Sequence, residues 1–376
     1  MALEIRRVQG RKEIRKFVLF PEKLYRNNPY YVPSLVFDEM GTLDPARNPA
    51  MEFCEAQLYM AYRDGKPVGR IAGIINHKAN AQWDHKEVRF GWFDFVDDPE
   101  VSRALMDKVV EMGRLAGMES VVGPLGFTDF DPEGMLVEGF DQESTMPLIY
   151  KHPDYPPHRE ALGFSKEKDW IERRFTVPEV LPDRYKRLCN IVMERNNVHM
   201  RELTRKIIRE EDYGHKIFNL INQTYKDLYN FTILPEDMAD KYLGFYLSVL
   251  DLRFLTIVEN AEGECVGFGI TMPSLAKALR KSRGRLFPFG WWPLLKSLYL
   301  KHEPGAELLL IGVRPDYQNR GINGLLITDI FYKFSKAGIK WAESNAILED
   351  NYKNQEQFKD FEYIQKKRRR SYKKAL

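Results

Sequence analysis

The chain has few cysteines, almost no net charge and no long apolar run. Its three cysteines, Cys54, Cys189 and Cys265, lie far apart and match neither a zinc-ligand spacing nor a disulfide framework, so we expect reduced thiols and no metal site. No stretch approaches the roughly 20 apolar residues that are needed to cross a bilayer, and residues 1–10 lack the apolar region of a signal peptide. We therefore expect a cytoplasmic protein that is soluble or, at most, peripheral to a membrane.

The net charge and the length of the chain further restrict the kind of protein that we expect. The chain has 57 Lys and Arg residues against 54 Asp and Glu residues, which gives a net charge of +3. This near-balance argues against a protein whose main task is to wrap nucleic acid, so nucleic acid is not an expected partner. The 376 residues are about twice the usual domain length of roughly 100–200 residues, and a hydrophobic content of 44% suffices for two cores.

The pattern of apolar residues and turn residues repeats once along the chain. The predicted elements of the first half are strands at 3–8, 58–63, 68–76, 88–95, 120–123 and 164–177 and helices at 11–25, 101–116 and 156–162. Those of the second half are strands at 198–204, 254–259, 266–272, 308–313, 341–347 and 363–372 and helices at 210–228, 235–250, 321–337 and 351–361. This order predicts a duplicated α+β unit, with domains at 1–175 and 198–376 and a linker at 176–197.

The sharpest signal is the transition from an apolar strand to a glycine-containing loop and a helix. Pro315 ends the strand at 308–313 because it cannot donate to a ladder. Glycines at a helix start let the backbone approach a ligand, and the first-turn N–H groups together with the helix dipole attract an anion such as a pyrophosphate. Arg320 adds a charged donor in this loop.

This segment resembles the acyl-CoA-binding motif of the GNAT superfamily. Gln318 and Gly321 match the motif, whereas Asn323 stands where the family usually has glycine or alanine, and Gly324 follows one residue later. The resemblance implies two tandem GNAT-like folds, each a mixed, mostly antiparallel sheet flanked by helices, with acetyl-CoA or a longer acyl-CoA as co-substrate. It implies a donor site made of Ile311, Gly312, Val313, Gln318, Asn319, Arg320, Gly321, Ile322, Asn323, Gly324 and Asn351.

The equivalent point in the first half carries acidic residues instead. The loop Val96-Asp97-Asp98-Pro99-Glu100 would cap its own helix and repel a phosphate. We therefore expect the first domain to have a degenerate donor site.

Acyl transfer to an amine needs a base, and the resemblance directs the search to two strands. The candidate catalytic residues are Glu343, Asn345, Glu307 and Tyr352. Glu343 and Asn345 share one face of the strand at 341–347, and the alternative for Glu343 is a salt bridge at a capped strand end. The family's tyrosine acid corresponds to Phe358, which cannot donate a proton, so Tyr352 replaces it or no acid is used. The alternative for Asn351 is a helix N-cap.

Two segments have compositions that suggest what kind of acceptor or surface the protein contacts. The insertion at 273–305 combines basic residues with an aromatic run at 286–295, a composition that suits a membrane interface or an acyl-chain groove, with peripheral membrane contact through 285–301. The alternative is an insertion that packs onto the first domain. The basic tail at 366–374 is read as a solvated strand end or as a site of attraction for phosphate or anionic lipid.

The sequence thus favours an acyl-CoA-dependent N-acyltransferase with a small-molecule or lipid amine as acceptor. Two alternatives stay open. One is a non-catalytic tandem GNAT-like protein that binds CoA or a lipid, which Asn323 and Phe358 favour. The other is an aminoacyl-tRNA-dependent transferase that uses the basic tail.

Overall fold

A computed structural model describes residues 2–239, 250–358 and 361–376 of the chain. It divides into two compact units that are not continuous in sequence. The first unit holds the residues up to Ile171 together with Ala276–Leu294 and Lys366–Leu376, and the second holds Glu172–Leu275 and Leu295–Gln365. Most of the insertion and most of the last strand thus belong to the first unit, although they interrupt or follow the second along the chain.

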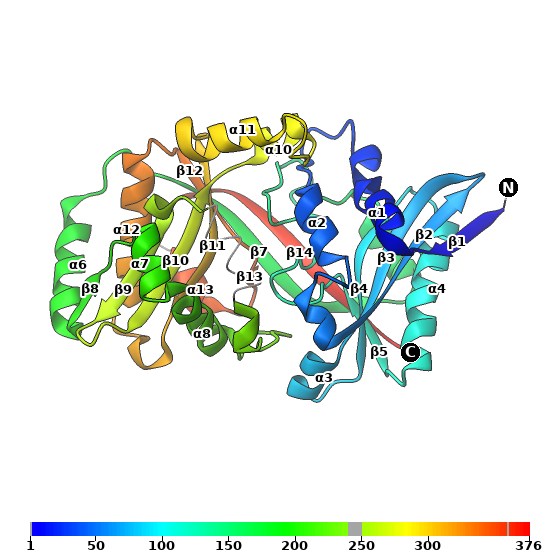
Figure 1. Cartoon of the computed structure of the whole chain (residues 1–376), viewed down its shortest axis with the longest axis horizontal. Coiled ribbons are helices and arrows are strands. Elements are labelled where there is room, and N and C mark those ends of the chain that lie inside the picture. The colour runs from blue at the N-terminus through cyan, green and yellow to red at the C-terminus, as the bar shows by residue number, and fades with distance from the viewer. Residues whose placement is uncertain (1, 240–249, 359–360) are drawn as a thin grey trace. The chain divides into compact units, whose positions relative to one another are not determined.

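The first unit is an α+β fold (Figure 1). Its strands are β1 (Leu3–Arg7), β2 (Cys54–Arg63), β3 (Lys66–Asn76), β4 (Glu87–Phe95), β5 (Ser120–Gly123), β6 (Met135–Glu138), the start of β7 (Ser165–Thr176) and most of β14 (Tyr363–Ala375). Its helices are α1 (Gly10–Leu24), α2 (Val36–Thr42), η1 (Pro49–Glu52), α3 (His77–Trp83), α4 (Pro99–Leu115), α5 (Tyr155–Ala161), α10 (Ala276–Ser282) and the start of α11 (Trp291–Leu295).

Its sheet has the order β1-β2-β3-β4-β5-β14, in which β4 and β5 are parallel and the other pairs antiparallel. The β2–β3 hairpin turns at Asp64 and Gly65, both with positive φ, as a two-residue hairpin turn requires. Helix α4 packs Val101, Leu105 and Val109 against one face, and α1 packs Ile14, Phe17 and Val18 against the other. The sheet is therefore buried between helices on both faces.

The second unit repeats this architecture. Its strands are the end of β7, β8 (Val198–Met200), β9 (Leu255–Asn260), β10 (Cys265–Pro273), β11 (Gly305–Val313), β12 (Trp341–Ser344) and β13 (Ile347–Leu348). Its helices are α6 (Asp183–Asn196), α7 (Arg205–Glu210), α8 (Tyr213–Tyr225), η2 (Glu236–Met238), η3 (Leu252–Phe254), η4 (Lys296–Leu300), η5 (Pro315–Tyr317), α12 (Ile322–Lys336) and α13 (Tyr352–Glu356).

The sheet order of the second unit is β7-β12-β11-β10-β9-β8, with only β11 and β12 parallel. Helix α12 covers one face, where Gly267 and Gly269 leave room for Ile322 and Ile330. Helix α8 covers the opposite face, where Thr224 approaches Gly312. The prediction of two mixed, mostly antiparallel sheets flanked by helices is confirmed.

Several predicted elements differ. The strand predicted at 341–347 is divided into β12 and β13, and the helix predicted at 351–361 is the shorter α13 among the described residues. The linker at 176–197 contains a 14-residue helix, α6, whose Cys189, Val192 and Met193 pack beside α12, so the segment is part of the second unit. The helix predicted at 210–228 is the shorter helix α8, and the helix α7 that precedes it was not predicted. The helix predicted at 235–250 lies largely outside the described residues.

The interpretation of the basic tail as a solvated strand end is wrong. Strand β14 pairs with β5 and β6, so every second side chain points into the first unit. Lys367 and Arg369 are 2% and 0% exposed and donate to the backbone carbonyls of Glu143 and Ile149. Arg370 is paired with the buried Asp169 at 2.7 Å. These cations are engaged within the protein, which leaves little of the tail for RNA.

Candidate donor and acyl-transfer site

The loop between β11 and α12 presents its backbone N–H groups without protein acceptors. Asn319 and Gly321 have φ values of 61° and 88°, which turn the chain sharply before the helix. Across residues 2–239, 250–358 and 361–376, no N–H group from Asn319 to Gly324 donates to another backbone carbonyl. Asn319, Arg320, Gly321 and Gly324 are exposed. Unpaired N–H groups at the start of a 15-residue helix attract an anion, so this loop remains the predicted donor site.

Side chains around this loop fix its shape. Gln318 donates from Nε2 to the Val313 carbonyl oxygen at 3.2 Å, which closes the loop onto the end of β11. Ile322 is buried below the helix start, and Gly321 lies so close to Val192 that a Cβ atom would be 2.9 Å from its Cγ2. Gly324 faces open space. The predicted loop residues are thus brought together, although their role in binding remains a prediction.

Charge at the loop is positive. Arg320 lies over the Tyr317 ring at 5.2 Å, and its charge contributes to the lowered pKa of Asp316, although no salt bridge joins the two among the residues described. Arg314 contacts the same ring at 4.8 Å but is engaged by Asp316 and Glu264, which holds its pKa far above the ordinary value. Arg320 is therefore the cation that the loop offers to an anion.

The parallel pairing of β11 and β12 stops before β11 ends. It runs from Gly305 and Trp341 to Leu308 and Ser344, after which β13 pairs with β7 instead. Asn345 closes the end of the pairing by donating its backbone N–H to Leu308 at 3.0 Å and its side chain to Leu309 at 3.3 Å. A register shift against β10 leaves Leu309 as a bulge. The edge of β11 from Leu309 to Val313 thus separates from the next strand.

Sequence reasoning missed Tyr225, the last residue of α8. Its hydroxyl donates to the Ile311 carbonyl oxygen at 2.7 Å and accepts from the Ile311 N–H at 3.2 Å. Burial raises the pKa of Tyr225 to about 12, so the hydroxyl is neutral at physiological pH. No local sequence signal marks this residue, because the contact depends on how α8 packs over β11.

Two predicted catalytic carboxylates lie side by side on the face of the sheet away from α12. Glu307 and Glu343 occupy matched positions on β11 and β12, and each is 2% exposed. Glu343 forms an ion pair with Arg174 at 2.6 Å, and the Arg174 guanidinium lies 3.9 Å from the Trp341 ring centroid. Glu307 accepts from the Ser274 hydroxyl at 3.1 Å. Glu343 therefore has the salt bridge that was the alternative to a catalytic role, and the Ser274 hydroxyl is one of the partners of Glu307.

The remaining predicted residues occupy α13. Asn351 caps this helix by accepting from the Asn354 N–H at 3.2 Å, in agreement with its alternative reading. Tyr352 is 70% exposed. Phe358 is buried and stacks on Phe175 with centroids 4.7 Å apart, so a core residue stands where the family has its tyrosine.

The first unit has no comparable loop. Asp98 caps α4 by accepting from the Glu100 N–H at 2.9 Å, and Arg63 pairs with both carboxylates. The helix start is thus satisfied by acidic side chains that repel an anion.

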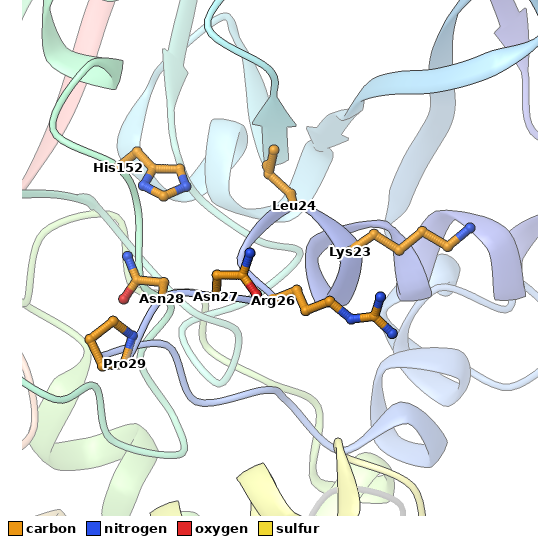
Figure 2. A pocket seen from close by; sticks show the side chains of 7 residues that line it. All are labelled: Lys23, Leu24, Arg26, Asn27, Asn28, Pro29 and His152. Carbon is orange, nitrogen blue, oxygen red and sulfur yellow. The ribbon is translucent and has the colours of Figure 1, made fainter.

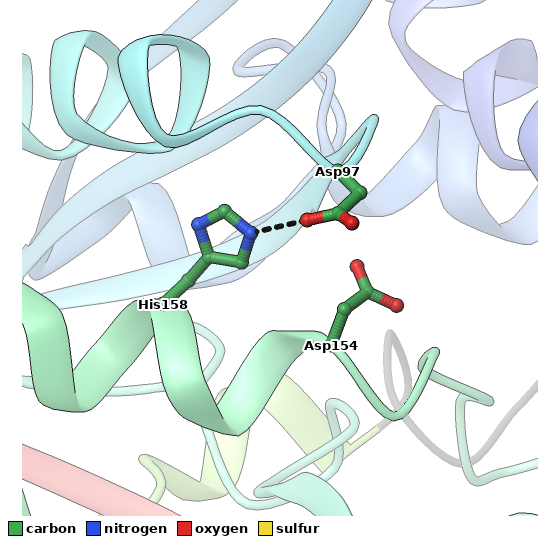
Figure 3. A group of neighbouring side chains, drawn as sticks. All are labelled: Asp97, Asp154 and His158. Carbon is green, nitrogen blue, oxygen red and sulfur yellow. Dashed lines mark hydrogen bonds and ion pairs between the residues drawn. The ribbon is translucent and has the colours of Figure 1, made fainter.

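Two further features belong to the first unit. Asp97, Asp154 and His158 could hold a metal ion, but His158 already bonds Asp97 at 2.8 Å and Ser102 at 3.0 Å (Figure 3). Lys23, Leu24, Arg26, Asn27, Asn28, Pro29 and His152 line a pocket, and Lys23 and Arg26 extend away from His152 (Figure 2).

These observations define a tandem protein of the GNAT acyl-CoA N-acyltransferase fold. A tandem GNAT protein from the clavulanic acid biosynthesis pathway superposes with a TM-score of 0.56 over 100% of this chain and 98% of its own, at 13% identity. No family model matches the chain. The bacterial ceramide synthase of Caulobacter vibrioides is 28% identical over 312 residues, which cover 81% of this chain and 79% of that protein. Protein YghO of Escherichia coli is 28% identical over 360 residues, covering 92% and 89%.

Proposed function

We propose that this chain is an acyl-CoA-dependent N-acyltransferase whose acceptor is a long-chain amine and whose donor binds to the second unit. The observation that carries the proposal is the set of N–H groups from Asn319 to Gly324 that donate to no backbone carbonyl at the start of α12. The similarity to a ceramide synthase supports the choice of acceptor, since a ceramide is the amide of a fatty acid with a long-chain amino alcohol.

The donor pyrophosphate would lie on the loop N–H groups, with Arg320 as the charged partner. The pantetheine arm would run along the edge of β11 from Val313 toward Leu309, where β12 no longer pairs. This path brings the thioester close to the end of the β11–β12 pairing. An arm that follows a strand edge exchanges main-chain hydrogen bonds as an added strand does.

Glu307 is the favoured base. The acceptor ammonium gives one proton to the Glu307 carboxylate, and its nitrogen then attacks the thioester carbon. The carbon–sulfur bond breaks and CoA leaves as a thiolate. The sulfur takes the proton that Glu307 holds, and the attacking nitrogen loses its second proton to water, which leaves a neutral amide and CoA. Glu343 is less suited because its ion pair with Arg174 stabilises the carboxylate against accepting a proton.

The test uses Gly324→Asp, because a side chain at this position meets no neighbouring atom. An acid in the first turn stabilises a helix, so the variant should fold while its charge repels the pyrophosphate. We expect loss of acetyl-, myristoyl- and palmitoyl-CoA binding in isothermal titration, and near wild-type binding by the neutral control Gly324→Asn. Unchanged affinity of the aspartate variant would contradict the proposal. The acyl-CoA that the wild type binds most tightly identifies the acyl-chain length of the donor.

We also propose that residues 285–301 contact the membrane from which a long-chain amine is taken. Phe287, Phe289, Trp291 and Trp292 form an aromatic cluster with exposed fractions of 79%, 79%, 41% and 51%. Hydrogen bonds from Trp291 N to Leu286 O and from Trp292 N to Phe289 O fold the segment on itself. Between Lys277 and Lys301 the sequence has seven cations and no acidic residue. Exposed aromatic side chains beside positive charge suit an anionic membrane surface.

No helix of the described residues is long and apolar enough to cross a membrane, so the proposed contact is peripheral. We expect binding to phosphatidylglycerol-containing vesicles that falls sharply in the double variant Phe287→Ser/Phe289→Ser. Phe37→Ser is the control, because Phe37 is 53% exposed on α2. Equal sedimentation of wild type and double variant with vesicles would rule out this surface. A change in oligomeric state instead would assign the cluster to self-association.

One observation favours a non-catalytic binding protein as the second candidate. Phe358 occupies the family's acid position and is locked in the core against Phe175. An assay for the release of CoA thiol from a mixture of acyl-CoA and a long-chain amine distinguishes an enzyme from a binding protein. A binding protein would bind acyl-CoA without releasing the thiol.

A further inference from the structure

Three polar side chains satisfy backbone groups at alternate residues along the open edge of β11. The contacts are Asn345 Nδ2 to Leu309 O at 3.3 Å, Tyr225 with both Ile311 groups at 2.7 and 3.2 Å, and Gln318 Nε2 to Val313 O at 3.2 Å. Each side chain takes the place of a neighbouring strand. The edge is therefore bonded where the proposed pantetheine path runs.

Tyr225 differs from the other two because it also accepts a hydrogen bond. Asn345 and Gln318 only donate to carbonyl oxygens, whereas the Tyr225 oxygen accepts from the Ile311 N–H. An N–H group carries one hydrogen. A carbonyl group of the donor that accepts from Ile311 must therefore displace the Tyr225 hydroxyl or share that hydrogen.

We propose that Tyr225 is a donor-affinity residue, whose hydroxyl holds the position on Ile311 that the acyl-CoA carbonyl takes and is displaced when acyl-CoA binds. This inference rests on the proposed function, because it requires an acyl-CoA donor along β11. Displacement costs part of the binding free energy, so Tyr225 weakens donor affinity while keeping the strand edge bonded.

The surroundings of Tyr225 allow the hydroxyl to leave without unfolding the helix. Its ring stacks on Phe231 with centroids 5.9 Å apart, and its position at the end of α8 places it at the least constrained turn of that helix. Close packing of Gly312 against Phe268 and Thr224 holds the next residue of β11 in place. The side chain can thus move while the strand does not.

The experiment compares Tyr225→Phe with Tyr332→Phe, whose side chain is 45% exposed on α12. Removing the hydroxyl frees the Ile311 N–H, so we expect the Kd for acyl-CoA to fall about two- to tenfold, the range given by the net worth of one hydrogen bond. Amide exchange at Ile311 in the free protein should become faster, and Tyr332→Phe should change none of these values.

An equal or higher Kd for Tyr225→Phe would overturn the proposal, and a loss of turnover at saturating donor would replace it with a direct catalytic role. If wild type and both variants bind no acyl-CoA, the proposed function itself fails. Binding by the wild type with no gain in the variant defeats the Tyr225 inference alone.

Discussion

Glu307 and Glu343 stand at matched positions on the parallel strands β11 and β12, and their carboxyl groups share the face of the sheet away from α12. The residues next to them, Ala306 and Ala342, pack into the core beneath α12. Side chains alternate along a strand, so the two carboxylates face the opposite side. Their partners differ, since Arg174 ion-pairs with Glu343 and the Ser274 hydroxyl donates to Glu307. We therefore propose a structural role for Glu343 and a role in proton transfer for Glu307.

Glu307→Gln tests the second role. We expect kcat to fall about 10²- to 10⁴-fold, the usual contribution of a general base, with the Kd for acyl-CoA unchanged. Glu194→Gln, an exposed position on α6, is the matched control. Steady-state kinetics with a long-chain amine supply the measurement. If the glutamine variant keeps wild-type turnover, the base is not Glu307.

Arg174→Met tests the structural role. It removes the ion pair and leaves Glu343, which is 2% exposed, without its cation. We expect the free energy of unfolding to fall by about 3–5 kcal/mol, as for other buried pairs that lose one partner. Urea unfolding of Arg174→Met and of Arg174→Met/Glu343→Met measures the effect. The double variant should recover much of the loss, and equal losses in both would argue against a coupled pair.

The sequence predicted those elements whose structure depends on a local pattern. It did not predict features that depend on contacts between segments far apart in the chain. Asp64-Gly65 signals the β2–β3 hairpin by itself. The burial of Arg369 could not be predicted, because nothing within 366–374 shows that β5 and β6 flank this strand. Helix α6 does carry a signal, the helical spacing of Cys189, Val192 and Met193, which the expectation of a linker overlooked.

In the candidate site, too, the residues of a local motif were predicted and those brought together only by the fold were not. The loop from Gln318 to Gly324 is a contiguous motif, so its residues were identified together. Tyr225 lies 86 positions before Ile311 in the sequence, and the contact between the two residues arises only in the fold. The choice between Glu307 and Glu343 likewise depends on Arg174, which β7 brings to β12.

Asp131 makes stability depend on pH. Burial raises the pKa of its carboxyl from 3.8 to about 7, although the N–H groups of Phe127 and Thr128 donate to it. The folded form therefore holds the proton more tightly than the unfolded form. Stability falls as pH rises from about 4 to about 7 and this contribution is constant above that.

We expect Asp131→Asn to remove at most about 4 kcal/mol of this pH dependence. Urea unfolding of wild type and variant at pH 4.5 and pH 8 provides the comparison. Parallel pH dependence in the two proteins would show that Asp131 does not titrate in this range.

Arg159 is a buried cation whose charge has no hydrogen-bonded partner. It is 0% exposed, its guanidinium nitrogens make no hydrogen bond within the described chain, and it lies 3.7 Å from the Phe93 ring centroid. Burial lowers its pKa to about 9. The aromatic contact offsets only part of the cost of desolvation, since a cation–π contact contributes about 2 kcal/mol.

Arg159→Met keeps the apolar stem and removes the charge. We expect a free energy of unfolding equal to the wild type or higher by up to about 3 kcal/mol at pH 7. The folded form disfavours the cation, so the penalty is fully present below pH 9 and is relieved between pH 9 and 12.5. The advantage of the variant should therefore shrink when unfolding is repeated at pH 10. Arg174→Met is the contrasting control, because the same substitution there breaks an ion pair. A variant that is less stable than the wild type, by an amount that changes with pH, would show that the guanidinium has a stabilising partner. A loss of packing alone would not depend on pH.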